Sequence, residues 1–492
     1  MVGFEKHSLM PLFRVFSEDA IDAIHSASLE VLEKTGVRIH HGESILKMLK
    51  DNGCTVDFEK ALVHFPSYVV EEAVKKTPKT HPSYGRNPKY DYKLDGRHVY
   101  FTTDTETPNT VDLQTGEWRP STLDDLEKLT RVTDALESYA SGGHLTTALD
   151  KPNNVRCLYD YAAALNNTEK PFGWSVYPPE LATQLTDYQL EIATAAAGSE
   201  KKLKERPLTE SGFCTESPLK FEGRYVEIAL KLAKLGFPCG VASMPFGGAT
   251  APVTFAGCLV MTNAEILSGI TTIQLAVPGT STRAEYIMGN LDMKTGLWGQ
   301  GPEEGLLFAG AVEVARHYGF RTTVLGFNTA CKMSGAQASY EKTMSTLLPV
   351  LAGADIVYQA GSLEGGMAAS FEELVMDDEI CKAVLKAVQG IEVNDETLAI
   401  DVIDKVGPGG HFLAEKHTLN HFKESLFFSE LTDRHSYDAW KKTGGKSMVK
   451  RARERAEEIL KEHWPTPLDK DVQKEISEII ERAEKELPKT TL

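Results

Sequence analysis

Aromatic side chains recur in this sequence at or just after the ends of segments whose apolar pattern predicts β-strands. A quaternary ammonium group has no hydrogen to donate, so a protein can hold it only with aromatic faces and carboxylates. Each aromatic face contributes about 0.5–2 kcal/mol. Packing in a core is the competing interpretation for each residue taken singly. The candidates for an aromatic cage are Trp174, Tyr177, Phe213, Phe246 and Phe327, with Trp298 and Tyr358 placed similarly.

Four polar residues follow the same predicted strands. Gln359 and Glu364 are expected to position a bound molecule. Arg283 and His144 would donate hydrogen bonds to a carboxylate, if the ligand carries one. Surface ion pairing is the competing interpretation for Arg283. The sequence offers no convincing pairing of a nucleophile with a base.

Three histidines form the array His411, His417 and His421, in which the second and third lie four residues apart. Such a pair on a helix can bind zinc, but no glutamate follows the first histidine of the pair. We favour a structural or interface role over a metal site. Lys332 is the one strand-end lysine to be considered for a Schiff base. The acidic residues of 372–379 are interpreted as the solvated start of a helix.

The elements that position these residues alternate between strand and helix from residue 121 onward. Seven strands are readable and an eighth is not, while the segments HVYFTT and NTVDLQTGEWRP predict a hairpin. We expect a (β/α)8 barrel at 121–435, an N-terminal elaboration at 1–120 and a C-terminal helical extension at 436–492. An open doubly wound sheet stays possible on pattern alone. The seven strands are predicted at 139–145, 171–176, 208–214, 238–243, 271–277, 321–327 and 355–359.

Composition narrows the class of protein. The 492 residues carry a formal charge of −17, which argues against nucleic acid as a partner. The first residues lack the apolar stretch of a signal peptide, and polar residues interrupt the apolar region 256–277, so a cytoplasmic protein with no membrane association is expected. The seven cysteines contain no Cys-x-x-Cys pair and are expected to be buried thiols.

The order of five segments resembles the trimethylamine methyltransferase family, whose members pass a methyl group from a methylated amine to a corrinoid protein. The segments are PFGGATAPVT, AGCLVMTNAEILSG, GPEEGLLFAGAVEVARHYG, GAQASYEK and VMDDEI. In the trimethylamine branch, the segment corresponding to Thr329–Gly335 contains pyrrolysine. Here it contains ordinary residues. Family members without pyrrolysine resemble enzymes that act on quaternary amines.

The resemblance therefore implies a methyltransferase that moves a methyl group from a quaternary amine, glycine betaine being favoured, to cobalt(I) of a partner corrinoid protein. It implies no tightly bound cofactor and a homo-oligomer. Proline betaine, carnitine or another betaine stays open as the substrate, and a non-catalytic methylated-amine binding protein is the alternative from another class. The loops expected to face the corrinoid contain Asn328, Gly335, Gln337, Gly365 and Gly366.

Overall fold

The centre of the protein is a parallel sheet of eight strands wrapped into a barrel. The computed structural model describes residues 13–173 and 175–489. The strand order is β10-β11-β13-β15-β18-β19-β6-β9, and the Gly142 N–H, after β9, donates to the Pro171 carbonyl, before β10, at 3.1 Å. The predicted (β/α)8 barrel is confirmed. Its strands are β6 (Tyr100–Thr103), β9 (Tyr139–Ser141), β10 (Phe172–Gly173), β11 (Thr209–Cys214), β13 (Cys239–Ser243), β15 (Thr282–Tyr286), β18 (Arg321–Leu325) and β19 (Ile356–Ala360).

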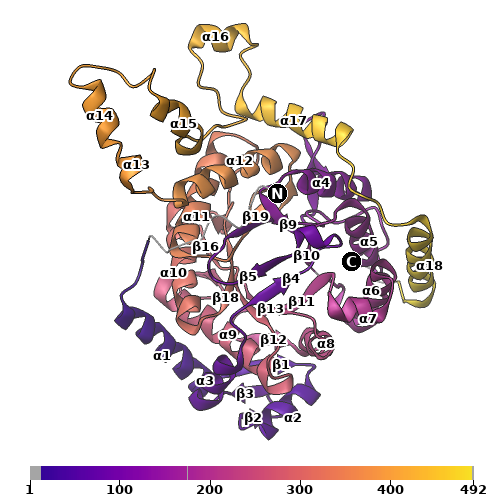
Figure 1. The fold of residues 1–492 in the computed structure, drawn as a ribbon. Coiled ribbons are helices and arrows are strands. Elements are labelled where there is room, and N and C mark those ends of the chain that lie inside the picture. The colour runs from indigo at the N-terminus through magenta and orange to yellow at the C-terminus, as the bar shows by residue number, and fades with distance from the viewer. Residues whose placement is uncertain (1–12, 174, 490–492) are drawn as a thin grey trace.

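Helices surround these strands as a ring (Figure 1). Left-handed glycines end three of them, at Gly198, Gly319 and Gly353, where a residue without Cβ adopts positive φ at little cost. The ring consists of α4 (Leu123–Ala135), α5 (Arg156–Asn167), η3 (Pro179–Leu181), α6 (Ala182–Ala197), α7 (Glu200–Glu205), α8 (Gly223–Lys234), α9 (Phe255–Ala276), α10 (Pro302–Tyr318), α11 (Ala336–Ala352) and α12 (Phe371–Val388).

Two of the predicted strands were wrong in detail. Residues 271–277 end the helix α9, and the fifth readable strand is instead β15, over Thr282–Tyr286. The eighth strand is β6, which pairs with β19 and β9 in the barrel instead of forming a hairpin with the segment after it. That hairpin is formed by β7 (Asn109–Val111) and β8 (Trp118–Pro120) alone. The barrel sheet therefore begins before residue 121.

The long helix α9 has the length and composition of a membrane span, with a mean hydropathy of 1.3, but 83% of that window is buried inside the fold. It packs against the barrel and against α1 (Glu18–Lys34) and α3 (Ser67–Lys76). A helix that is apolar all round is explained by burial on every side. Among the described residues no other helix meets the same test.

The N-terminal segment covers one side and the amino-terminal end of the barrel. A small sheet joins β1 (Val37–His40), β2 (Thr55–Asp57) and β3 (Leu62–His64) to β12 (Lys220–Glu222), beside α2 (Glu43–Asp51). The hairpin of β4 (His81–Ser83) and β5 (Tyr92–Leu94), with η2 (Pro88–Tyr90) between them, lies across the strands (Figure 1). Ser281, just before β15, donates to the Thr80 carbonyl at 2.9 Å. This hairpin therefore closes the end opposite the carboxyl ends of the strands.

The carboxyl ends of the strands form the other end, which we call the mouth. Short strands in the loops there build two small sheets. One contains β14 (Phe246–Gly247), β16 (Gly289–Leu291) and β17 (Trp298–Gly299), and the other contains β20 (Ser362–Leu363), β21 (Ala368–Ala369), β7 and β8.

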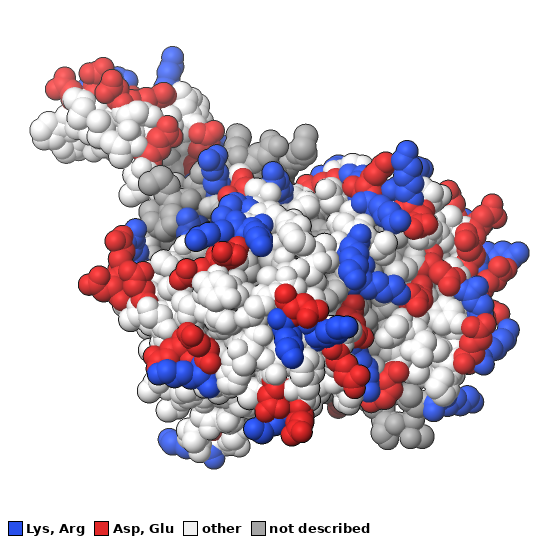
Figure 2. Space-filling view, turned by 90° about the horizontal axis from the view of Figure 1, so that it is seen from below, with Lys and Arg blue, Asp and Glu red and all other residues white. Residues whose placement is uncertain are grey.

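The C-terminal extension binds the outside of the barrel. The helix α17 (Met448–Glu462) packs on α12 and α4, and α18 (Lys470–Glu486) packs on α6. Between α12 and α17 the chain projects away from the barrel (Figure 1) through α13 (Asp395–Leu398), α14 (Ile400–Val406), α15 (Lys416–Ser425) and α16 (Tyr437–Lys442). On the face shown in Figure 2, acidic and basic side chains are interspersed, without a broad basic patch.

Candidate active site

A buried carboxylate lies at the mouth just after β6. Asp104 is 4% exposed, and its Oδ1 accepts hydrogen bonds from the Tyr358 hydroxyl and the Thr105 N–H, both at 2.8 Å. Its Oδ2 is buried and has no hydrogen-bond partner among the described residues. Burial raises the pKa of Asp104, and the hydrogen-bond donors around the carboxylate act against this rise. An acceptor without a donor is suited to a cationic ligand.

Gln359 lies beside this carboxylate because of an irregularity in β19. The register with β6 shifts between Val357 and Ala360, and Gln359 has a φ of 95° although it is not glycine. Its side chain is buried, and Oε1 has no partner within the described chain. Backbone strain of this kind gathers at functional sites. The structure thus places Gln359 where a positioning residue was predicted.

An aromatic pair lies at the mouth after β13 and β15. The rings of Phe246 and Trp298 meet edge to face, with centroids 5.1 Å apart. The Trp298 indole donates to Oε1 of Glu304 at 2.8 Å, and the Asn328 amide donates to Oε2 at 2.6 Å. Burial raises the pKa of Glu304 to about 8, and these donors act in the opposite direction. Glu304 therefore fixes the orientation of the Trp298 ring.

Two adjacent glycines bring the carboxylate and the aromatic pair to the same loop. A Cβ added to Gly365 would lie 3.1 Å from Trp298, and one added to Gly366 would lie 2.9 Å from Asp104 Oδ2. Both glycines have positive φ, at 60° and 92°. Because neighbouring Cα atoms are about 3.8 Å apart, Trp298 and Asp104 border one shared region. The predicted loop residues Gly365 and Gly366 thus lie against the site itself.

A second polar group lies after β9 and β10. The Nε2 of His144 is 3.7 Å from Oε1 of Glu106, and Nδ1 of His144 is buried without a partner among the described residues. Burial lowers the pKa of His144, so the imidazole is neutral at neutral pH. The Tyr177 hydroxyl donates to Asp160 at 2.6 Å. His144 and Tyr177 are therefore both at the mouth, as predicted, but the Tyr177 hydroxyl is already engaged.

Two predicted binding residues, Phe213 and Phe327, lie away from the mouth, and a third cannot be placed. Phe213 faces the helix layer, where its ring packs on Phe221 beneath α9, and Phe327 is fully buried against Phe101. Because side chains alternate between the two faces of a strand, Phe213 lies on the face of β11 that is opposite to the barrel interior. Trp174 lies outside the described residues.

Arg283 was expected after a strand, but it lies within β15, inside the barrel. Its guanidinium contacts Glu210 Oε2 at 2.5 Å and Glu285 Oε1 at 2.9 Å. Glu210 also contacts His81 in the hairpin that closes the amino-terminal end. These contacts occupy the guanidinium in the interior of the barrel, away from the mouth.

The other predicted residues form their own local contacts. Glu364 pairs with the exposed Lys332 at 3.2 Å, so Lys332 is not the buried lysine that a Schiff base requires. Asn328 is buried against Glu304, Gln337 is exposed and donates to Glu341, and a Cβ on Gly335 would meet no atom within 4 Å.

The three histidines lie in the projecting segment, far along the chain from the mouth. The rings of His417 and His421 lie with centroids 4.4 Å apart and planes tilted by 39°, and each contacts Glu396 at 3.1 Å. His411 is exposed. In the described part of the chain, no group of three or more His, Cys, Asp or Glu side chains is arranged to hold a metal ion.

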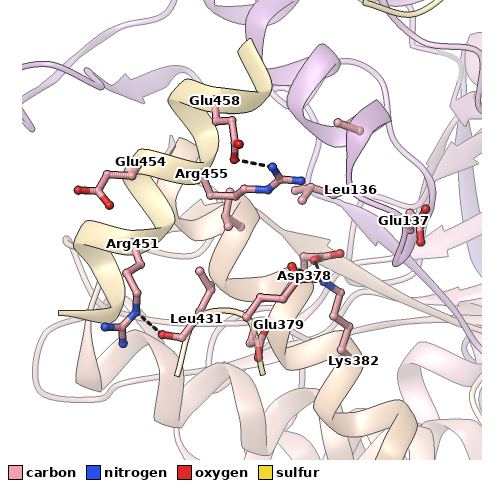
Figure 3. A pocket seen from close by; sticks show the side chains of 13 residues that line it. Leu136, Glu137, Asp378, Glu379, Lys382, Leu431, Arg451, Glu454, Arg455 and Glu458 are labelled. Carbon is pink, nitrogen blue, oxygen red and sulfur yellow. Dashed lines mark hydrogen bonds and ion pairs between the residues drawn. The ribbon is translucent and has the colours of Figure 1, made fainter. Parts of the chain in front are cut away.

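The acidic residues of 372–379 are buried, so their interpretation as a solvated helix start was wrong. Lys342 of α11 is itself fully buried and pairs with Glu373 at 2.8 Å and with Asp377 at 2.7 Å. Nearby, a pocket of about 670 Å³ is lined by residues of α12 and α17 and by the end of α4 (Figure 3). Apolar side chains line it together with charged ones, among them Lys382, Arg451 and Arg455. It lies on the outside of the barrel and shares no residue with the mouth.

An apolar rim borders one side of the mouth. Six side chains in the loops after β13, β15, β18 and β19 are between 44% and 72% exposed. Methionine predominates, and its flexible side chain suits surfaces that bind and release partners. The rim consists of Met244, Val253, Met293, Leu297, Met333 and Met367.

Sequence reasoning missed Asp104 and Glu304 as site residues. Asp104 follows β6, which was assigned to a hairpin, so it was not recognised as following a barrel strand. Glu304 falls in the first turn of α10, where an acidic residue has an ordinary role near the helix dipole. The signal available was the order of the strands, because the loops that follow barrel strands build the mouth.

Known proteins match nearly the whole chain. The family described as Trimethylamine methyltransferase (MTTB) matches residues 5–488. A protein of Desulfitobacterium hafniense (strain DSM 10664 / DCB-2) named trimethylamine methyltransferase MttB is 36% identical over 96% of this chain and 94% of its own. A protein of strain Y51 of that species, named glycine betaine methyltransferase, is 31% identical over 97% of this chain and 99% of its own.

Among solved structures, a crystal structure of a hydroxylamine complex of MtmB aligns with a TM-score of 0.48 at 12% identity, over 91% of this chain and 88% of that one. Family assignment comes from the sequence matches, which extend through barrel, N-terminal segment and C-terminal helices alike. The chain belongs to the trimethylamine methyltransferase family.

Proposed function

We propose that the protein transfers a methyl group from a quaternary amine, with glycine betaine as the favoured substrate, to cobalt(I) of a corrinoid protein and releases the tertiary amine. The observation that carries this proposal is the unpartnered Oδ2 of Asp104 beside the Phe246–Trp298 pair. A fully methylated nitrogen offers no hydrogen bond, so it is held by negative charge and by aromatic faces. This site provides both.

The reaction requires little of the protein beyond placing the substrate methyl group in line with cobalt. The bond between nitrogen and the methyl carbon breaks, its electron pair stays on nitrogen, and the amine leaves neutral without taking a proton. A reduced corrinoid supplies the electron pair for the new bond. No acid or base is required of the chain, and orientation within a preorganised site accounts for the acceleration. Glu304 contributes by holding Trp298, and Tyr358 by holding Asp104.

The apolar rim at the mouth is an argument for docking of a protein partner that carries the corrinoid. A flat macrocycle must approach the substrate from the open end, because the β4–β5 hairpin covers the other end. The exposed methionines of the rim provide apolar surface there. The glycines at 365 and 366 carry no side chain that would block close approach.

Ordinary residues in Thr329–Gly335 favour quaternary amines over trimethylamine as substrates, following the resemblance stated above. Ala330 and Cys331 occupy this loop, with the Cys331 N–H bonded to Thr329. The relative named glycine betaine methyltransferase supports glycine betaine as the first amine to test. Proline betaine and carnitine are the next candidates.

The test is methylation of cob(I)alamin, followed by its absorbance, with glycine betaine as donor and detection of dimethylglycine as product. We expect both products in equal amounts. Binding of glycine betaine without any methylation, with free cob(I)alamin or a corrinoid protein, would instead identify a non-catalytic binding protein.

A further inference from the structure

Arg156 is a buried cation without a counterion in contact. It is the first residue of α5 and is 8% exposed, and its Nε is buried without a hydrogen-bond partner among the described residues. None of the ion pairs in the described chain includes it. Other buried arginines have partners: Arg321 pairs with Asp355 at 3.0 Å, and Arg131 stacks on Trp464 at 4.0 Å. A buried charge without a partner is costly, so its retention points to an anion that the protein binds.

Arg156 shares its surroundings with groups of the mouth. Burial raises the pKa of Glu106, while a hydrogen bond from Ser175 and the charge of Arg156 act against that rise. The same Glu106 lies 3.7 Å from His144, whose Nδ1 is buried and unpartnered among the described residues. Two side chains that each keep one unpartnered nitrogen, Nε of Arg156 and Nδ1 of His144, thus lie near the carboxylate of Glu106, which follows β6. The amino-terminal end of the twelve-residue helix α5 adds its favourable dipole.

The opposite side of the mouth carries the aromatic pair. In the closed order of the strands, β9 and β15 are four positions apart in either direction, so they face each other across the barrel. His144 and Arg156 follow β9, and Trp298 follows β15. The site is therefore polarised, with aromatic faces on one side and a guanidinium on the other, and Asp104 follows β6, the strand next to β9. Arg283 cannot take this second role, because Glu210 and Glu285 already occupy its guanidinium.

We propose that Arg156, assisted by His144, forms a carboxylate-binding subsite, and that the substrate is accordingly a zwitterion with a quaternary ammonium group and a carboxylate. This inference rests on the proposed function for the position of the ammonium group. Arginine suits the role because its planar fork contacts both carboxylate oxygens at once. The subsite selects against methylated amines that lack an acid group, since these would leave Arg156 unpaired.

The experiment compares two ligands in variants of one residue. Titration calorimetry measures the Kd of glycine betaine and of choline, which keeps the trimethylammonium group and lacks the carboxylate. Arg156→Met should raise the Kd of glycine betaine about 10- to 100-fold and leave that of choline unchanged or lower. Arg156→Lys should restore part of the affinity, because it restores the charge without the fork.

Arg131→Met is the matched control. Arg131 has the same exposure, 8%, and an unpartnered Nε, but it lies on α4 against Trp464 and away from the mouth. It should leave both Kd values unchanged. Thermal unfolding of each variant shows whether the fold is kept, and Arg156→Lys supplies the comparison if Arg156→Met unfolds.

An equal loss of affinity for both ligands in Arg156→Met, or no loss of affinity for either, would overturn the proposal of a carboxylate subsite. The proposed function fails separately, if wild-type protein binds glycine betaine in an Arg156-dependent manner but methylates no corrinoid. Conversely, methylation that proceeds from choline as well as from glycine betaine, and equally in Arg156→Met, keeps the methyl transfer and removes the subsite.

Discussion

The hydroxyl of Tyr358 donates a 2.8 Å hydrogen bond to Oδ1 of Asp104, and Oδ2 of the same carboxylate stays buried without a partner. Tyr358 belongs to β19 and Asp104 follows β6, so the pair joins adjacent barrel strands at the mouth. The hydrogen bond orients the carboxylate and leaves its second oxygen as an acceptor. A site that served stability alone would have satisfied both oxygens.

Asp104→Asn should therefore weaken ligand binding while it stabilises the protein. The raised pKa means that the folded state disfavours the ionised carboxylate. The pKa of Asp104 is higher in the folded state than in the unfolded state. As pH rises through the interval between these two pKa values, ionisation of Asp104 lowers the free energy of unfolding, and the loss persists above that interval. We expect a higher midpoint of thermal unfolding for the variant at pH 7.5 and a Kd for glycine betaine raised about tenfold or more. A parallel loss of stability and affinity would assign Asp104 a structural role.

The same group predicts the pH dependence of binding. Protonation removes the negative charge, so wild-type affinity for glycine betaine should fall as pH is lowered through the raised pKa of Asp104. Calorimetry over a series of pH values measures this. The Asn variant should lack that part of the dependence.

Glu304 should report on Trp298 through fluorescence. Its pKa of about 8 lies above the usual value of 4.5, so the carboxyl is protonated below pH 8 and gains its charge as pH rises. The group's contribution to stability is present at low pH and is lost as pH rises through about 8. Because the Trp298 indole donates to this carboxylate, its emission should change with a midpoint near pH 8.

Glu304→Gln supplies the comparison for that titration. The amide cannot accept from Asn328 and Trp298 on both of its atoms, so the ring should lose its fixed orientation. We expect no emission change near pH 8 and weaker binding of glycine betaine. An unaltered titration in the variant would show that another group is responsible.

The aromatic residues separate into binding and core positions. Trp298→Leu and Phe246→Leu should each weaken glycine betaine binding by about 0.5–2 kcal/mol with little loss of stability. Phe213→Leu and Phe327→Leu should lower the free energy of unfolding and leave the Kd unchanged, because these rings are buried against other core aromatics. If Phe213→Leu and Phe327→Leu weaken binding while Trp298→Leu and Phe246→Leu only lower stability, the placement of the cation site is wrong.

The buried triad around Lys342 predicts a large effect on stability. Lys342→Met leaves Glu373 and Asp377 buried without their cation and should lower the free energy of unfolding by about 3–5 kcal/mol. The control is Lys446→Met, in which a partly exposed lysine loses its partly exposed partner Glu454 at a cost of about 0–1 kcal/mol. Chemical denaturation of both variants measures the difference.

The rim predicts a defect that appears only with a protein partner. Met293→Glu or Met333→Glu, at side chains 72% and 71% exposed, should slow methyl transfer to the corrinoid protein without changing glycine betaine affinity or transfer to free cob(I)alamin. Wild-type rates with the corrinoid protein in both variants would place docking elsewhere. Leu419→Glu, equally exposed at 70% but on the projecting α15, is the control.

The sequence predicted the barrel and several mouth residues, and the errors have physical causes. The run Thr271–Val277 is rich in β-branched residues and resembles a strand, but tertiary packing continues α9 through Ala276. The true strand, β15, looks polar because Arg283 and Glu285 fill the interior of the barrel with an ion pair. Strand β6 has only four residues and is followed by a real hairpin.

The candidate site was harder to predict than the fold, since proximity across the barrel is not written in local sequence. His144 and Phe246 were recognised because each follows a strand that the pattern shows, and Gln359 because it ends one. Asp104 follows the strand that was missed. Arg156 begins a helix, and only burial without a counterion distinguishes it from an ordinary surface arginine.

A direct competition tests the central claim. Glycine betaine bearing deuterated N-methyl groups and unlabelled trimethylamine are supplied together at equal concentration with the enzyme and cob(I)alamin, and mass spectrometry reads the label on the methylated product. We predict methylcobalamin that carries almost only the deuterated methyl group, with release of deuterated dimethylglycine. A product that carries mainly the unlabelled methyl group of trimethylamine would contradict the account.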